Sequence, residues 1–152
     1  MPEKLLQPTW APTSASGRSI HRRHHRHRRP HALVAFNVNL ATSDVEIAKK
    51  IAKVIRGSSG GFRSCKAMGF MLEDRGIAQV SMNMVNYEDT PLYVVYEMIR
   101  SLAERYGTYI VDSEIVGLTP AKAMIDCAEF YLKARDFDCH NQIMEYHLIG
   151  ME

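Results

Sequence analysis

Five uncharged polar residues, spaced two apart within otherwise apolar segments, have the side chains best suited to hold a ligand. They are Asn37, Asn39, Gln79, Ser81 and Asn83. Amides and hydroxyls both donate and accept hydrogen bonds, so such a group can bind a polar ligand or form a buried polar interface. A strand surface in water more often carries Lys and Glu, and a core carries Val and Ile. The alternative is that these residues are solvated on an open sheet face.

The segments that carry these residues have the alternation of half-buried strands. In LVAFNVNL (33–40), apolar residues at every second position alternate with the two asparagines, and residues 77–85 repeat the pattern. A helix is predicted between them. Ser43 and Glu46 have the spacing of a capping box. Its apolar stripe is formed by Ile47, Ile51, Val54 and Ile55.

Four further elements follow from patterning and turn chemistry. Residues 65–72 and 109–117 are predicted strands, the first joined to 77–85 by a hairpin turn at 73–76. Thr90-Pro91 and Thr119-Pro120 each offer a capping hydroxyl followed by proline at the first helical position. The first of these helices has apolar positions at Leu92, Val95, Ile99 and Leu102, and the second at Met124, Ile125, Ala128 and Leu132. A short last helix covers about 141–148.

This order predicts an α/β (α+β) fold of the ferredoxin-like βαββαβ type. Its four-stranded sheet, antiparallel or mixed, has helices on one face and extra C-terminal helices. In this topology the first and third strands are central neighbours. The five polar side chains would therefore form one patch on the face without helices.

Composition divides the chain at residue 31. Residues 1–31 hold seven Lys/Arg and one Glu, whereas the remainder holds 12 Lys/Arg and 16 Asp/Glu. We expect residues 1–31 to be a disordered Arg/His-rich segment and residues 32–150 to be the folded domain. The mildly acidic domain does not suggest specific nucleic-acid binding. The Arg-rich, acid-poor composition of residues 1–31 is only weak evidence for a transit peptide, because their histidine content is too high for one.

Cysteine and histidine positions predict neither a metal site nor a catalytic centre. Three cysteines without C-x-x-C spacing suggest reduced thiols in a cytoplasmic protein. The sequence contains no apolar stretch of 18 residues, so no membrane span is predicted. The histidines of residues 21–31 lack a fold that would fix metal geometry. His140 and His147 lack a partner that would tune a catalytic base. Cys127 is interpreted as a core residue, and Gly117 and Thr119 as a helix start with a minor anion-binding alternative.

Three segments carry a resemblance to a known family. LVAFNVNL, AQVSMNMVNYEDTPLYVVYEMIR and SEIVGLTPAKAMIDCAEFYL agree in order and spacing with the C-terminal subdomain of the glutamate formimidoyltransferase (formiminotransferase) family. The front, PEKLLQPTWAP, also resembles the family. The run that follows it in the family is replaced here by TSASGRSIHRRHHRHRRPH, which we interpret as a remnant of the inter-subdomain segment and, as a hypothesis, as an out-of-frame reading.

The resemblance implies a folate-dependent transferase of histidine degradation and one-carbon metabolism. In this family two subdomains sandwich tetrahydrofolate, which accepts a formimino group from N-formiminoglutamate without a metal. The resemblance makes folate and an N-terminal formiminotransferase subdomain the expected partners and leaves a homodimer open. The patch of Asn37, Asn39, Gln79, Ser81 and Asn83 would be one wall of the folate cleft. The family's catalytic histidine lies in the N-terminal subdomain, so this chain alone is expected to be inactive. The alternatives are a non-catalytic interaction module and an inactive fragment.

Overall fold

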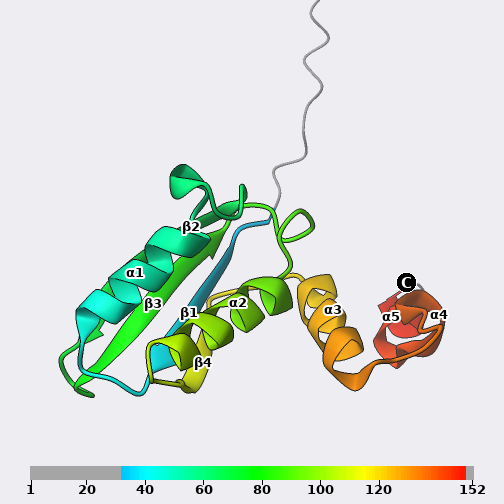
Figure 1. The fold of residues 1–152 in the computed structure, drawn as a ribbon. Helices are drawn as coiled ribbons and strands as arrows, with labels where there is room; N and C mark the ends of the chain where they lie inside the picture. The colour runs from blue at the N-terminus through cyan, green and yellow to red at the C-terminus, as the bar shows by residue number, and fades with distance from the viewer. Residues whose placement is uncertain (1–31, 150–152) are drawn as a thin grey trace, which may run out of the picture.

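Four antiparallel strands form one sheet in the order β2-β3-β1-β4 (Figure 1). The strands are β1 (Val34–Leu40), β2 (Cys65–Leu72), β3 (Ile77–Met84) and β4 (Ile110–Val116). The computed structural model describes residues 32–149, so the expectations for residues 1–31 lie outside the described residues. The βαββαβ order and the sheet predicted from the sequence are confirmed. All three strand pairs are antiparallel, so the mixed alternative is wrong.

The central pair of strands is β1 and β3, as the sequence predicts. Asn37 lies opposite Ser81, and Asn39 lies opposite Gln79. On its other edge β1 pairs with β4, which places Glu114 beside Asn37 and Asp112 beside Asn39. The register therefore extends each polar pair of the central strands to a carboxylate on β4.

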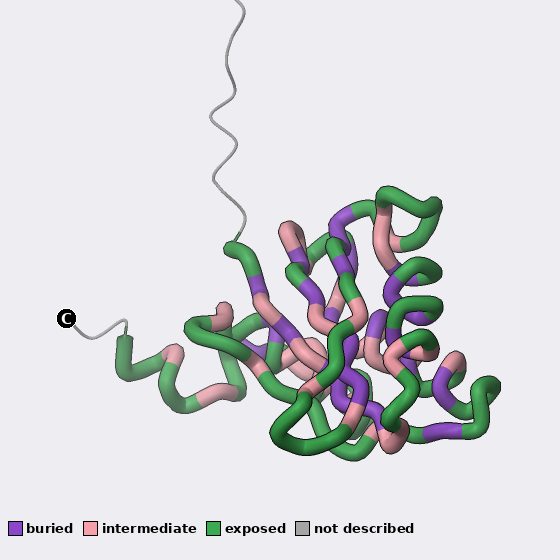
Figure 2. The backbone as a smooth tube through the Cα atoms, turned by 90° about the vertical axis from the view of Figure 1, so that its left-hand side faces the viewer, coloured by how far each residue is buried: buried purple, intermediate pink, exposed green. Residues whose placement is uncertain are grey.

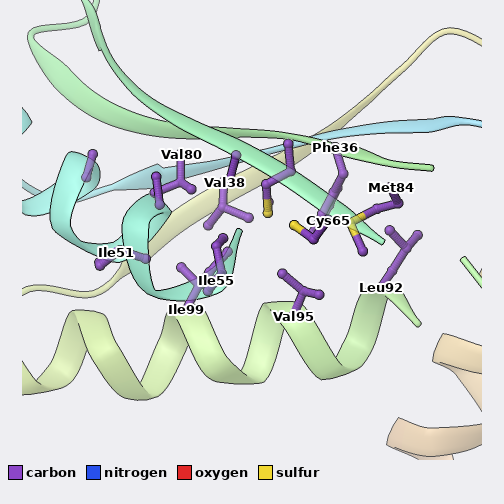
Figure 3. Close-up of a cluster of buried hydrophobic side chains, with 14 of the residues drawn as sticks. Phe36, Val38, Ile51, Ile55, Cys65, Val80, Met84, Leu92, Val95 and Ile99 are labelled. Carbon is purple, nitrogen blue, oxygen red and sulfur yellow. The ribbon is translucent and has the colours of Figure 1, made fainter. Parts of the chain in front are cut away.

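Two helices cover one face of the sheet and enclose the core. They are α1 (Val45–Ile55) and α2 (Leu92–Arg105). Figure 3 shows side chains from both helices meeting those of β1, β2 and β3. The fully buried core includes Val34, Val38, Leu40, Ile51, Ile55, Val80, Met84, Val95 and Ile99. Because alternate residues of each strand enter this core, the intervening residues lie on the opposite face of the sheet.

The start of α1 differs from the predicted capping box. Asp44, not Ser43, is the N-cap, and its Oδ1 accepts a hydrogen bond of 2.9 Å from the backbone N–H of Glu46. The Glu46 carboxylate forms an ion pair with Lys49 instead of returning to Ser43. Val54, predicted in the apolar stripe, is 47% exposed, and Ala48 and Ala52 are buried in its place. Small residues on this side let the helix approach the sheet closely.

The two Thr-Pro helix starts also differ from the prediction. In the described part of the chain, neither α2 nor α3 (Ala121–Leu132) has a side-chain cap hydrogen bond, and Pro91 and Pro120 occupy the N-cap position. Thr90 is buried, and Thr119 Oγ1 is buried without a partner among residues 32–149. Each helix starts one residue later than predicted. Proline is therefore the N-cap instead of the first helical residue, and each threonine precedes the cap.

The C-terminal helices lie beside the sheet and not over it (Figure 1). Of the positions predicted as core on α3, Met124 is 42% and Leu132 is 77% exposed, and Ala123 is the buried residue of this helix. The predicted last helix is two short helices, α4 (Cys139–Gln142) and α5 (Met144–Ile149). Figure 2 shows that most of this region is exposed.

Candidate functional site

The helix-free side of the sheet, which we call the open face, has three rows of side chains that run across the strands. The row at the hairpin end contains Phe70, Gln79, Asn39 and Asp112. The middle row contains Met68, Ser81, Asn37 and Glu114, and the third contains Lys66, Asn83, Ala35 and Val116. The structure thus brings all five predicted site residues together on one face.

Burial divides the five predicted residues into two groups. Asn39 and Gln79 are 2% and 7% exposed, Asn37 and Ser81 are half-buried, and Asn83 is exposed. A buried amide loses its hydrogen bonds to water, so it needs partners within the protein. The simple alternative of solvated polar residues therefore fits Asn83 but does not fit Asn39 or Gln79.

A chain of hydrogen bonds links these two buried amides to a carboxylate. Gln79 Nε2 donates to Asn39 Oδ1 at 2.9 Å, and Asn39 Nδ2 donates to Asp112 Oδ1. The other oxygen, Asp112 Oδ2, accepts from Arg75 Nη2 at 2.7 Å. Arg75 lies in the β2–β3 turn, and its side chain extends across the end of β1 to Asp112 on the edge strand β4. We call these four residues the amide relay.

Electrostatics keep the last acceptor of the amide relay ionised. The hydrogen bond from Arg75 and then that from Asn39 lower the pKa of Asp112 below the ordinary aspartate value. Conversely, Asp112 raises the pKa of Arg75. Near neutral pH, Asp112 is a carboxylate that can only accept hydrogen bonds.

A second feature of the open face is a cationic hollow at the β2 edge. It encloses about 500 Å³ and is lined by Ser81, Asn83 and apolar β2 residues together with Arg56, Arg63 and Lys66. Arg56 Nε donates to Ser59 Oγ, and none of the three cations forms an ion pair with a described carboxylate. Met68 and Phe70, which also line it, are 60% and 45% exposed. The hollow joins positive charge, polar groups and apolar surface.

Sequence reasoning missed the charged residues of this site. Asp112 and Glu114 lie two residues apart in the fourth predicted strand, on one face of it, and a βαββαβ sheet places that strand beside the first. That signal was sufficient to find both carboxylates. By contrast, Arg75 is in a turn and Arg56 follows a helix, and no sequence period predicts that they reach the same face.

The two histidines of the folded part lie on other elements. His140, on α4, stacks at an angle on Tyr146 with 5.1 Å between ring centroids. His147 Nε2, on α5, is 3.2 Å from the backbone oxygen of Asn141. Neither contacts the open face, and no group of three potential metal-ligating side chains occurs within residues 32–149.

The remaining minor candidates lie on the helical side. Cys127 is half-buried on α3, and burial raises the pKa of its thiol, which makes it a poor nucleophile. With Tyr96, Tyr131 and other apolar residues it lines a cavity of about 560 Å³ between α2, α3 and β4. Gly117 has a φ of +76°, and Thr119 follows it without capping α3.

Comparison with known proteins decides the family. Residues 35–149 match the model of the formiminotransferase domain. This chain belongs to the formiminotransferase family. It is 56% identical to a glutamate formimidoyltransferase of Streptococcus pyogenes serotype M1, over 99% of this chain and 50% of that protein. The glutamate formimidoyltransferase of Thermoplasma acidophilum is 51% identical over 70% of this chain and 35% of the relative.

The formiminotransferase match extends to larger proteins. A formimidoyltransferase-cyclodeaminase of Gallus gallus is 36% identical over 88% of this chain and 26% of that protein. The chain thus spans half or less of the length of these relatives. Among the described residues of this family member, no helix has the length and apolar character needed to cross a bilayer.

Proposed function

We propose that this chain forms one wall of the tetrahydrofolate cleft of a glutamate formimidoyltransferase. The observation that carries the proposal is the open face, where five uncharged polar residues meet on the two central strands. Asn37, Asn39, Gln79, Ser81 and Asn83 are the proposed contacts. In this proposal, residues 32–150 are the C-terminal subdomain, and the N-terminal subdomain covers the open face and supplies the opposite wall.

The chemical character of the open face supports this assignment. Tetrahydrofolate has a nitrogen-rich ring, an aromatic linker and a glutamate with carboxylates. Amides such as Asn39 and Gln79 suit the ring, because ring nitrogens and carbonyls offer both donors and acceptors. Exposed Phe70 suits the linker. The cations of the hollow suit a carboxylate, with which Arg makes strong charge-assisted hydrogen bonds.

In the proposed reaction, folate nitrogen 5 attacks the amidine carbon of N-formiminoglutamate. A bond from nitrogen 5 to that carbon forms, the bond from the carbon to the glutamate nitrogen breaks, and the proton from nitrogen 5 goes to a general base. Glutamate leaves after its nitrogen is protonated. The described residues place no histidine on the open face, so we assign the base to the other subdomain and positioning to this one.

Complementation tests the proposal. The purified chain is mixed with a separately expressed N-terminal half of a glutamate formimidoyltransferase, tetrahydrofolate and N-formiminoglutamate, and formation of 5-formiminotetrahydrofolate is followed. We expect turnover with both halves and none with either half. Loss of a base commonly reduces the rate by about 10²–10⁴ and loss of positioning by more, so the single chain should fall far below enzymatic rates.

The variant Asn37→Leu and the control Ile149→Ala sharpen this experiment. Asn37 lies in the middle of the open face, whereas Ile149 is 75% exposed on α5. The proposal requires turnover to fall in the first mixture and to persist in the second. Binding of the two halves without turnover would instead support a non-catalytic interaction module, and no binding would support an inactive fragment. We propose the cytoplasm as the location, on the cysteine usage alone.

A further inference from the structure

We infer that Asp112 is a positioning residue that fixes the orientation of two buried amides, so that the open face presents the Gln79 side-chain oxygen to an N–H donor of the ligand. This inference rests on the proposed function for the identity of the ligand. It rests on the amide relay for everything else. A side-chain amide can turn over and exchange its donor and acceptor ends, so something must select one orientation.

The selection begins at the carboxylate. Asp112 can only accept, and Arg75 holds it in the ionised form by a 2.7 Å ion pair. The neighbouring Asn39 must therefore direct its NH₂ group toward Asp112. This leaves Asn39 Oδ1 facing Gln79, and Gln79 must in turn direct its own NH₂ group toward Asn39. Each step has one solution, because the reversed amide would place two acceptors or two donors together.

These successive hydrogen bonds leave a hydrogen-bond acceptor of defined orientation at the end of the amide relay. Gln79 Nε2 is engaged, and no described residue donates to Gln79 Oε1. Gln79 keeps a 7% exposed fraction and lies on the open face between Phe70 and Asn39, so the exposed part of its side chain is at that face. The remainder of Gln79 is buried, which holds the oxygen in place.

An acceptor held in this way favours a ligand with N–H donors. Both substrates of the proposed function offer one: the reduced pterin ring through its amino and ring N–H groups, and the formimino group through its nitrogen. The shared chemistry is an N–H next to an sp² carbon. A ligand with an acceptor at this position would face the Gln79 oxygen and leave both groups without a hydrogen bond.

The first experiment measures exchange of side-chain amide protons with solvent by NMR in the free chain. We expect Asn39 and Gln79 to exchange at least tenfold more slowly than Asn83, which has no side-chain hydrogen bond to a described residue and is exposed. Asp112→Asn can donate or accept, so protection should fall at both residues. Asp74→Asn is a charge-matched control in the same turn as Arg75, and it should leave the protection of both side-chain amides unchanged. Equal exchange at Asn39 and Asn83 in the unmodified chain overturns the inference.

The second experiment titrates the same proteins with 6-methyltetrahydropterin and, separately, with N-formiminoglutamate. We expect one probe to shift the Gln79 amide signal and to bind about tenfold more weakly to Asp112→Asn than to Asp74→Asn. Arg75→Gln keeps the obligatory acceptor, so it should lose less affinity than Asp112→Asn. The probe that shifts Gln79 identifies the source of the N–H.

Two failures are distinguishable. If both probes and tetrahydrofolate leave every signal of the open face unchanged, the ligand part of this inference is overturned, whereas turnover in the mixture of the two halves still decides the proposed function. If a probe binds the open face but Asp112→Asn and Asp74→Asn bind it equally well, the cleft assignment stands and the orienting role of Asp112 is overturned. Amide spectra of the backbone report whether each variant is folded.

Discussion

At the scale of single residues, Asp112 links the charge and the hydrogen bonding of the open face. It lies exposed on the edge strand, yet it accepts from the nearly fully buried Asn39 and ends the chain of hydrogen bonds that begins at the buried Gln79. Glu114, on the same strand and face, is the next charge along, and it also acts on Arg75. An exposed carboxylate thus determines the state of buried amides, which are costly to leave without a partner.

Acid should release the amide relay. Arg75 and Asn39 lower the pKa of Asp112, and a carboxylate with a lowered folded-state pKa contributes stability above its unfolded pKa and loses it as pH falls through the folded value. We therefore expect slow exchange at the Asn39 side chain to persist at neutral pH. It should disappear below the ordinary aspartate pKa of about 3.9.

The measurement is side-chain amide exchange against pH, with the known acid and base catalysis of free asparagine exchange subtracted. The group that titrates is Asp112, and the charged groups facing it are Arg75 and Glu114. Arg75→Gln should raise the midpoint, because it removes the charged hydrogen-bond donor that does most to lower the pKa of Asp112. An unchanged midpoint in that variant would contradict the assignment of Arg75.

The N-cap of α1 supplies a second prediction at the residue scale. Asp44→Ala should lower the free energy of unfolding by about 1 kcal/mol, because its side chain accepts from the Glu46 N–H. Ser43→Ala is the matched control and should change it by less than about 0.5 kcal/mol. Urea unfolding measures both. The reverse order of effects would restore the capping box expected from the sequence.

At the scale of elements, the packing of α1 on the sheet depends on a glycine. A Cβ at Gly69 of β2 would lie 2.4 Å from the backbone nitrogen of Lys49 and 2.6 Å from the backbone carbon of Ala48. Both neighbours are helix backbone, so neither can move aside alone. The close approach fits the small Ala48 at this crossing, and Ala48 and Ala52, but not Val54, join Ile51 and Ile55 on the buried side of α1.

Gly69→Ala should therefore destabilise the protein by about 1–3 kcal/mol or more, because the whole helix must move to admit the methyl group. Met68→Ala is the control, since Met68 is the neighbouring residue on the open face and is 60% exposed. We expect the control to change stability by less than about 0.5 kcal/mol. Chemical denaturation compares the two, and equal midpoints would show that α1 does not pack on β2 in this way.

Sequence patterns predicted strands better than the outer helices, for a physical reason. Val38 and Asn39 alternate because one side of β1 is core and the other is not, and this is visible in a single strand. The helical periodicity of residues 121–132 places Met124 and Leu132 on an apolar face of α3, but it does not show which element packs against that face. Arg75 had no signal of either kind, because a turn residue has no period.

At the scale of the whole molecule, the chain consists of a well-packed sheet layer and a loosely attached C-terminal part. The core cluster comes from β1, β2, β3, α1 and α2, with Ala123 as the contribution of α3. The contacts that join α3 to α2 include the stacked rings of Tyr93 and Phe130, 4.3 Å apart, the edge-to-face rings of Tyr96 and Tyr131, and the Tyr131 hydroxyl, which donates to Glu97 at 2.9 Å. Beyond α3, Cys139 is the buried residue of α4, and α5 has none.

Removal of residues 137–152 should therefore leave the sheet layer folded. The deleted helices bury little apolar surface, and regions with few buried contacts add little to global stability. We expect the free energy of unfolding to change by about 1 kcal/mol or less, with the Asn39 side chain still protected from exchange. Ile99→Ala, a fully buried core change, should cost about 2–5 kcal/mol in the same urea assay. If the truncated chain loses as much stability as Ile99→Ala, α4 and α5 are part of the core unit, and the open face depends on them.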